Sequence, residues 1–459
     1  MRDAGRLAAA IEILTDVETR HRPVRLALKG WGESSRFAGS KDRAWVSGLV
    51  LDALRRRRSL AWRMNDDSPR AAVLATLSAF WGWDLERIGQ AAGEEPHGPG
   101  PLTDAESASL AAPRDLNEAP AAVQGDYPDW LETSFVRVFG DDRAAEGAAL
   151  AERAPVDLRV NTLKTDPERA LKAVAPLHAE PVAALATALR IAAPDPSQRA
   201  GSVETIPAFS KGWFEVQDLG SQIAAAAAGE IKGKQVLDLC AGGGGKTLAL
   251  AAAMGNTGQI YAYDSEARRL ADTIRRADRA GVRNLQVRSP VNPEPLKGLE
   301  GKMDVVFIDA PCSGSGAWRR HPDTKWRLSQ ETFARRMADQ DAVLDLGSGF
   351  VKPGGRMIYV TCSVLPEENE DRVAAFLHRH GGFAVRRAFI PPQSASPTAP
   401  PGGEHPKSSP SAQRGLGEGD REAVEGVLAK QITPDGYLRL SPRTCATDGF
   451  FVAVLERLK

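Results

Sequence analysis

The chain has 459 residues, and its 59 lysines and arginines are balanced by 59 aspartates and glutamates, so its formal net charge is zero. Apolar residues make up 42% and charged residues 26%, close to globular averages, which excludes wholesale disorder. No apolar run approaches the roughly 18 residues that a transmembrane helix needs. Four cysteines in so long a chain exclude a disulfide framework and predict a cytoplasmic protein.

The first half of the chain predicts two small domains, and the length predicts about three in all. Residues 1–90 carry apolar residues at helical spacing and predict an all-α domain that starts with an amphipathic helix. Residues 91–127 are rich in Pro, Gly and small residues, which predicts a linker. Residues 128–228 mix a helix-like DWLETSFVRVF with a strand-like DLRVNTLKT, and they predict a small α+β module.

Residues 229–459 alternate strand and helix patterns, which predicts an α/β domain with a parallel sheet. One helix is expected over 265–281, with Ser265 as its N-cap and with Leu270 and Ile274 four residues apart on one face. A second helix is expected to begin at Pro366. The expected strands are 235–239, 259–264, 284–288, 304–309 and 356–361.

Residues 391–420 have low complexity and are rich in Pro, Ser and Gly, which predicts a disordered surface loop. Residues 448–457 follow this loop and read as a strand. The loop is therefore expected to be an insertion before the last strands.

The segment DLCAGGGGKT (238–247) follows a strand and opens a helix, so it can bring backbone N–H groups close to a ligand. A phosphate-binding loop needs Gly six residues before its Lys, but that position is Cys240. A dinucleotide fingerprint fails as well, because Thr247 or Leu248 falls where its last Gly should be. The third candidate ligand of the loop is S-adenosylmethionine. Asp264 ends the next strand, where an acid can bind the ribose diol of this ligand. A glycine turn without a ligand is the alternative.

Two cysteines follow neighbouring strands: Cys312 lies in DAPCSGSG and Cys362 in VTCSVLPEENE. Because ligands bind beyond the carboxyl ends of parallel strands, both thiols are expected on the ligand side. Small buried cysteines are the alternative. No metal site is expected, because no paired Cys or His spacing is present.

A methyl donor and two thiols together indicate cytosine-5 methylation. Carbon 5 of cytosine becomes nucleophilic only after a thiolate adds at carbon 6, and a base must later remove the carbon 5 proton. One thiol would attack and the other would assist release. Asp309 is placed to favour protonation at the N3 edge of the ring.

At these residues the sequence resembles the RNA cytosine-5 methyltransferases of the Sun family, and most of all the bacterial branch that modifies 16S rRNA. The resemblance lies in DLCAGGGGK, DAPCSGSGAWRRHPDTKWR, TCSVLPEENE and DGFFVAVLER, and upstream in RVNTLKT and WFEVQDLGSQ. Residues 1–90 more weakly resemble the antitermination-factor-like RNA-binding domain of this branch. The resemblance implies a Rossmann-like class I methyltransferase sheet after an α+β RNA-recognition-like module.

The resemblance implies that Cys362 is the nucleophile and Cys312 the release residue. DNA cytosine methyltransferases instead use the Cys of a Pro-Cys motif, so Pro311-Cys312 invites the opposite assignment. The resemblance to the Sun family also implies that Lys246 supports Asp309. The residues implied to contact the methyl donor or the base are Cys240, Ala241, Gly242, Gly243, Gly244, Gly245, Lys246, Asp264 and Asp309.

Two features depart from the family. Gly242 and Gly243 stand where the family has Ala and Pro, which predicts weaker donor binding unless packing fixes the loop. The family also has an Asp after the third strand for the adenine amino group, and here only Asn292 is a candidate substitute.

Basic and aromatic residues interleave in 316–336, which has six Lys and Arg against two acids. Cations for phosphates and rings for stacking suit an unstacked nucleotide, and a solvated helix face is the alternative. Arg55 to Arg58 form a second basic cluster, and a solvated helix face is again the alternative to phosphate contact. The predicted RNA-binding residues are Arg319, Arg320, His321, Lys325, Trp326, Arg55 and Arg56.

The sequence therefore predicts a monomeric, S-adenosylmethionine-dependent RNA (cytosine-5) methyltransferase that acts on ribosomal RNA or a small-subunit precursor. The alternatives are a transfer-RNA methyltransferase, a non-catalytic RNA-binding assembly factor, and, least supported, an ATP-driven protein built on GGGGKT. Cys445 receives no role.

Overall fold

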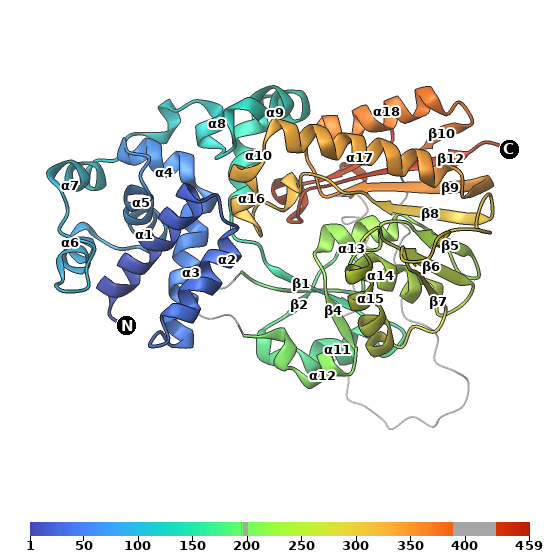
Figure 1. Ribbon diagram of the computed structural model, residues 1–459, viewed down its shortest axis with the longest axis horizontal. Helices are drawn as coiled ribbons and strands as arrows, with labels where there is room; N and C mark the ends of the chain where they lie inside the picture. Colours follow the sequence, from blue (N-terminus) through green and yellow to red (C-terminus); the bar gives the residue numbers. More distant parts are fainter. Residues whose placement is uncertain (194, 196–200, 389–427) are drawn as a thin grey trace, which may run out of the picture.

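A computed structural model describes residues 1–193, 195, 201–388 and 428–459, so the insertion predicted over 391–420 lies outside the described residues. Figure 1 shows a bundle of helices at one end, a large sheet layered between helices at the other, and a small sheet beside them. The predicted fold class, all-α followed by α+β and then α/β, is confirmed.

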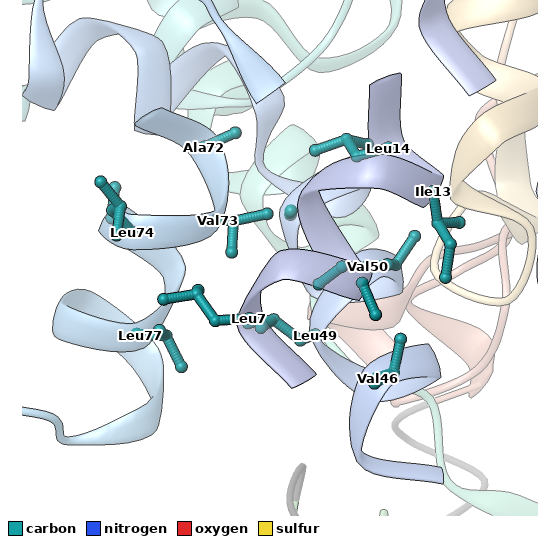
Figure 2. Packing of buried hydrophobic residues seen from close by; sticks show 14 of the residues in the cluster. Leu7, Ile13, Leu14, Val46, Leu49, Val50, Ala72, Val73, Leu74 and Leu77 are labelled. Carbon is teal, nitrogen blue, oxygen red and sulfur yellow. The ribbon is translucent and has the colours of Figure 1, made fainter. Parts of the chain in front are cut away.

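The N-terminal helices form because their apolar residues recur at helical spacing and meet in one core. Leu7 and Leu14 of the first helix pack with Val46 and Leu49 of the third and with Leu77 of the fifth (Figure 2). The helices are α1 (Asp3–Thr19), α2 (Val24–Ser34), α3 (Ser40–Arg55), α4 (Arg57–Met64), α5 (Pro69–Trp81) and α6 (Leu85–Gly93).

The predicted linker 91–127 is partly helical and is attached to this bundle. Thr103 and Glu106 form a capping box at the start of α7 (Asp104–Ala111), in which each side chain accepts the backbone N–H of the other residue. Arg70 of α5 pairs with Glu106 at 2.6 Å. The short η1 (Leu116–Glu118) and α8 (Ala121–Gln124) follow.

The middle of the chain folds into a four-stranded antiparallel sheet of order β2-β3-β1-β4. Leu158, Val160 and Phe214 are fully buried in its core. Its strands are β1 (Val156–Val160), β2 (Glu180–Pro181), β3 (Ala188–Ile191) and β4 (Phe214–Val216). The helices are η2 (Asp129–Leu131), α9 (Glu132–Phe139), η3 (Gly140–Asp142), α10 (Arg143–Leu150), α11 (Pro167–Ala173), η4 (Ala175–Leu177), η5 (Val203–Thr205) and α12 (Pro207–Ser210).

The large sheet has the order β10-β12-β9-β8-β5-β6-β7, and β11 pairs with β12. The five predicted strands are present and mutually parallel, while β10, β11 and β12 extend the sheet antiparallel. The chain order reverses at β5, because β6 lies on one side of it and β8 on the other. The strands are β5 (Gln235–Asp238), β6 (Gln259–Tyr263), β7 (Leu285–Arg288), β8 (Met303–Asp309), β9 (Val351–Thr361), β10 (Phe383–Arg386), β11 (Leu438–Leu440) and β12 (Phe450–Arg457).

Both faces of the large sheet are covered, since successive residues of each strand point to opposite faces. Val236 and Phe307 pack under α13 and α14, while Leu237 and Ile308 pack under α17 and α18. Such a reversal between covered faces opens a crevice at the carboxyl ends of the strands. The helices are α13 (Leu219–Ala226), α14 (Gly245–Met254), α15 (Ala267–Ala280), η6 (Ser315–Ala317), α16 (Pro322–Arg327), α17 (Gln330–Ser348), η7 (Pro366–Glu368), α18 (Glu370–Arg379) and α20 (Pro442–Cys445).

Helix α15 differs in detail from its prediction. Its N-cap is Glu266 and not Ser265, and no side chain caps the helix. Leu270 is buried as expected, but Ile274 is 47% exposed, because the inner face is made by Leu270, Thr273 and Ala277. Thr273 thereby faces the glycine loop.

Candidate active site

The glycine loop between β5 and α14 is held in one conformation by α15. Gly242 and Gly244 have φ angles of +54° and +82°, a region that residues with a side chain rarely adopt. A Cβ on Gly244 would lie 3.1 Å from the Cα of Thr273. Thr273 Oγ1 donates to the Gly242 carbonyl at 2.9 Å, and Arg276 Nη1 donates to that of Gly243 at 2.5 Å. Packing therefore fixes the loop that lacks the family's Ala and Pro.

Asp264 follows β6 and is buried beside this loop. Its Oδ2 accepts the Gly242 N–H and its Oδ1 accepts the Glu266 N–H, both at 2.8 Å. Arg269 Nη1 also donates to Oδ2, at 3.5 Å, so about one of the four acceptor positions of the carboxylate is left for a ribose hydroxyl. The loop and the acid could therefore hold an adenosyl group, and their assignment to the methyl donor stays a prediction.

The start of the loop is also buried. Burial raises the pKa of Asp238 to about 7, although Thr247 Oγ1 donates to it at 2.6 Å. Burial and the neighbouring carboxylates raise the pKa of the Cys240 thiol, so Cys240 stays an uncharged thiol at the start of the loop. Asn292 is exposed in the turn after β7, and its assignment to the adenine stays a prediction.

The two predicted cysteines meet beyond the ends of β8 and β9. Cys312 Sγ lies 3.4 Å from Cys362 Sγ, and both residues are half-buried. The Gly316 N–H donates to the Cys362 carbonyl at 2.9 Å, which ties the two loops together. The expectation that both thiols lie at the same edge of the sheet is confirmed.

Lys246 and Asp309 form an ion pair at the same edge, with Nζ 2.7 Å from Oδ2. Lys246 is buried, and its ammonium lies 5.2 Å from the ring centre of Phe450. Burial favours the neutral amine, but the charge and hydrogen bond of Asp309, with a smaller contribution from Cys362, raise the pKa of Lys246. Lys246 therefore stays protonated beside Asp309.

The thiols differ electrostatically. The hydrogen bond to Cys362, burial, and the negative charges of Cys362 and Glu368 hold the pKa of Cys312 well above its ordinary value. Because the thiolate is the nucleophilic form of cysteine, these surroundings disfavour Cys312 as the nucleophile.

Sequence reasoning missed a polar layer behind the thiols, made of the buried Gln340, Ser363 and Glu368 and the half-buried Ser313. The signal was a Ser directly after each Cys, together with the acids of PEENE.

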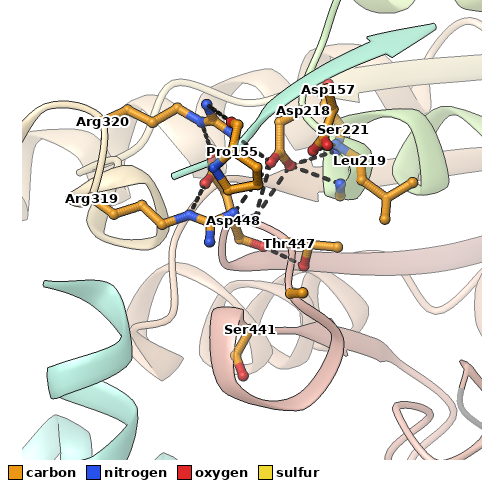
Figure 3. Close-up of polar contacts among 12 residues, drawn as sticks. Pro155, Asp157, Asp218, Leu219, Ser221, Arg319, Arg320, Ser441, Thr447 and Asp448 are labelled. Atoms are coloured by element: carbon orange, nitrogen blue, oxygen red, sulfur yellow. Dashed lines mark hydrogen bonds and ion pairs between the residues drawn. The ribbon is translucent and has the colours of Figure 1, made fainter. Parts of the chain in front are cut away.

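The predicted RNA contacts of Arg319 and Arg320 are not supported by the structure (Figure 3). Arg319 is buried and its Nε lies 2.5 Å from Asp448 Oδ1. Arg320 pairs with Asp448 at 2.5 Å and with Asp218 at 2.8 Å. Arg320 Nη1 also donates to the Pro155 carbonyl at 2.9 Å, directly before β1, and Asp448 precedes β12, so Arg320 joins the small module to the large sheet.

The two predicted basic clusters meet each other inside the protein. Lys325 is 1% exposed and donates to the Arg55 carbonyl at 2.9 Å. Trp326 Nε1 donates to the Leu54 carbonyl at 2.7 Å, and the buried Arg55 donates to the Arg319 carbonyl. The predicted phosphate contacts of Lys325 and Arg55 are therefore wrong. These side chains instead lie in the contact between α16 and the N-terminal bundle.

Arg56 and His321 are the remaining residues that were predicted to contact RNA. Arg56 lies 4.2 Å over the ring of Phe80. His321 is exposed, so RNA contact by this residue stays a prediction. Cys445, which had no role, donates from its thiol to the Ser441 carbonyl at 3.2 Å in α20.

We expect the buried Lys325 to make stability depend on pH. Burial lowers its pKa to about 7, whereas an unfolded lysine titrates near 10.4. Between about pH 7 and 10 the unfolded chain binds a proton that the folded chain does not, so the free energy of unfolding rises with pH, by at most about 1.4 kcal/mol per unit. Urea unfolding of Lys325→Met should lack this rise, and equal slopes in both proteins would contradict the expectation.

Within the described residues, no group of three or more His, Cys, Asp or Glu side chains could hold a metal ion. In the same part of the chain, no helix has both the length and the hydrophobicity needed to cross a bilayer.

Comparison with known proteins identifies the domain that contains the thiols. Residues 228–456 match the family model described as 16S rRNA methyltransferase RsmB/F. This region of the chain belongs to that family. The match includes the glycine loop, Asp309 and both cysteines, and it confirms the resemblance seen in the sequence.

Relatives named as methyltransferase B of the small ribosomal subunit cover part of the chain. The protein of Synechocystis is 33% identical over 56% of this chain and 57% of its own length. That of Photorhabdus laumondii is 32% identical over 55% of this chain and 58% of its own. That of Salmonella typhi is 32% identical over 61% of this chain and 64% of its own. The matched region thus spans less than two thirds of these relatives.

Solved structures of the same fold cover more of the chain. PH0851 aligns with all of this chain and 99% of its own, with a TM-score of 0.68 and 22% identity. NSun6 from Pyrococcus horikoshii, solved with SFG, aligns with 72% of this chain and 98% of its own, with a TM-score of 0.57 and 20% identity. These likenesses confirm the predicted Rossmann-like fold.

Proposed function

We propose that this protein transfers a methyl group from S-adenosylmethionine to carbon 5 of a cytosine in 16S rRNA, through a covalent bond between Cys362 and the base. The observation that carries the proposal is the pair of thiols 3.4 Å apart, next to the Lys246–Asp309 ion pair. The family of residues 228–456 supports the methyl transfer and the ribosomal RNA substrate.

The glycine loop and Asp264 would hold the methyl donor, which supplies an electrophilic methyl group when bound. The Cys362 thiolate adds to carbon 6 of the cytosine, and this addition makes carbon 5 nucleophilic. Asp309, held by Lys246, orients the N3 edge of the ring and stabilises a proton that N3 takes from solvent as electron density shifts toward it; N3 returns this proton to solvent when the base is released. Carbon 5 then takes the methyl group.

Release needs a base for the proton on carbon 5. Once the sulfur of Cys362 is bonded to carbon, it no longer carries the charge that opposes ionisation of Cys312. Cys312 can then give its thiol proton to solvent and accept the carbon 5 proton as a thiolate. The bond between sulfur and carbon 6 breaks, and Cys362 leaves as a thiolate. Cys312 is suited to this role because its sulfur lies 3.4 Å from the sulfur of Cys362.

The target cytosine must be unpaired or flipped to reach thiols that lie in a crevice. We propose ribosomal RNA or a small-subunit precursor as the partner, a monomeric enzyme, and the cytoplasm as its location. Transfer RNA is the rival substrate. Bisulfite sequencing of ribosomal and transfer RNA from a deletion strain tests this: loss of one 5-methylcytosine in 16S rRNA is expected, whereas loss confined to transfer RNA would overturn the substrate assignment.

A non-catalytic RNA-binding assembly factor is the rival from another class, motivated by Gly242 and Gly243. Calorimetry with S-adenosylmethionine separates the two. We expect binding, because α15 fixes the loop. Absence of binding at millimolar donor would remove the enzymatic reading.

We expect Gly244→Ala to weaken donor binding at least tenfold. The new Cβ would contact the Cα of Thr273 at 3.1 Å, and the left-handed backbone costs about 1–2 kcal/mol for a residue with a side chain. Gly243→Ala is the matched control, since its φ is not positive and its Cβ would meet only Arg276 Nη1, at 3.6 Å. Calorimetry with S-adenosylmethionine measures both, and equal affinities would contradict a role for the Gly244 turn.

A further inference from the structure

Helix α15 lies between the small sheet and the glycine loop, and one of its side chains contacts both (Figure 1). Toward the loop, Arg276 Nη1 donates to the Gly243 carbonyl at 2.5 Å. Toward the small sheet, Nε and Nη2 of the same guanidinium donate to Oε2 of Glu215 in β4, at 3.1 and 2.9 Å. A single planar group therefore bridges the small sheet and the loop, with a different edge on each.

The contact at Gly243 fixes one peptide group of the loop. The C=O and the N–H of a trans peptide point in opposite directions. The Gly243 carbonyl points to Arg276, and the N–H on the other side of that peptide, which belongs to Gly244, donates to the Ala241 carbonyl at 2.9 Å. Both ends of the peptide are thus bonded. Glycine has the greatest backbone freedom, so these bonds remove conformations that the loop would otherwise visit.

Glu215 holds Arg276 from a buried position. Its side chain is only 3% exposed, and its carboxylate also accepts Arg279 Nη2 at 2.5 Å. Arg159 lies opposite Glu215 on β1 but directs its Nε to Gln217, at 2.6 Å. The bonds that the Glu215 carboxylate accepts therefore come from α15. Because water has little access to this carboxylate, the ion pair with Arg276 is stronger than an exposed one.

We propose that Glu215 is a positioning residue for the methyl donor. It holds the Arg276 guanidinium against the Gly243 carbonyl, and it thereby sets the shape of the loop to which S-adenosylmethionine is assigned. A carboxylate of the small sheet thus acts on the donor site through α15. This inference rests on the proposed function for the place of the donor.

The small module is attached to α15 at other points as well. Asn161 Nδ2 donates to the carbonyls of Ala280, at the end of α15, and of Gly212, both at 2.8 Å. A Cβ on Gly212 would lie 2.8 Å from the carbonyl carbon of Arg279, so the two backbones are in close contact. These contacts keep the module against α15 when Glu215 is changed. The effect of Glu215 on the loop can therefore be measured in a folded protein.

Calorimetry with S-adenosylmethionine on the full chain tests the proposal. Glu215→Gln keeps the size of the side chain but removes its charge, so we expect the dissociation constant of the donor to rise at least about fivefold. Arg276→Lys keeps a cation beside Glu215, but its single nitrogen cannot bridge to the Gly243 carbonyl as the guanidinium does. For this second variant we expect a rise of about tenfold.

Arg279→Gln is the matched control, because Arg279 pairs with the same carboxylate but lies 4.1 Å over the ring of Phe209 in the small module. It should leave the affinity for the donor unchanged. Unchanged affinity in folded Glu215→Gln would overturn the proposal. An equal loss in Arg279→Gln and Arg276→Lys would do so as well, even if Glu215→Gln does not fold, because the donor site would then respond to any loosening of α15.

These outcomes are distinct from a failure of the proposed function. Absence of donor binding to the unmodified sequence would overturn both. Normal binding to the unmodified sequence, with no difference among the variants, would overturn only the role of Glu215.

Discussion

Cys312→Ala should accumulate a covalent RNA–protein complex that survives denaturation, while Cys362→Ala should form none. Without Cys312 the attack by Cys362 still occurs, but no thiolate removes the carbon 5 proton, so the bond to carbon 6 persists. Loss of a proton-transferring group lowers turnover by about 10²–10⁴-fold. Without Cys362 the carbon is not activated, and methyl transfer should fall to background. Denaturing electrophoresis with labelled rRNA detects the complex.

Cys445→Ala is the matched control for removal of a thiol. Cys445 is a free, half-buried cysteine that bonds only within α20 and its neighbourhood. Its loss should leave both the complex and the turnover unchanged. A stable complex with Cys362→Ala and none with Cys312→Ala would reverse the assignment of the two thiols, and would then favour the Pro-Cys nucleophile of the DNA enzymes.

Much of the α/β domain could be predicted from the sequence, because its strands are short apolar runs that end in residues with special chemistry. The position of Cys312 after β8 and of Cys362 after β9 follows from the rule that parallel strands end at one edge. The contact of the two sulfurs needed only the further fact that β8 and β9 are neighbours. The ion pair of Lys246 with Asp309 was expected from the resemblance alone.

The RNA-binding residues could not be predicted in the same way, because the sequence does not distinguish a basic residue that faces solvent from one that faces a buried partner. Arg319 and Lys325 lie in a segment with a net positive charge, but their partners are Asp448, 129 residues away, and the Arg55 carbonyl, 270 residues away. Sequence periodicity carries no information on such distant pairs. Glu368 escaped notice for the same reason: its donors come from Ser313 and Gln340, on two other elements.

Asp448→Ala should lower the free energy of unfolding by about 3–5 kcal/mol, because it leaves a buried guanidinium without its main partner. Asp448 accepts from Arg319 and Arg320, both at 2.5 Å, and Arg319 is only 4% exposed. Asp218, 3.6 Å from Arg319, is already bonded to Arg320 and cannot take over. Urea unfolding at constant pH gives the difference.

The control for this loss is Glu331→Gln, which breaks an exposed ion pair with Arg335 at the start of α17. Exposed pairs contribute only about 0–1 kcal/mol, so its unfolding curve should nearly overlay that of the unmodified sequence. Asp448→Ala should also loosen the small module, since Arg320 joins Asp448 to the Pro155 carbonyl directly before β1. Faster hydrogen exchange in β1 and β4 is the expected sign. A cost below about 1 kcal/mol would instead mean that water reaches Arg319, and that the charge network does not hold the module against the large sheet.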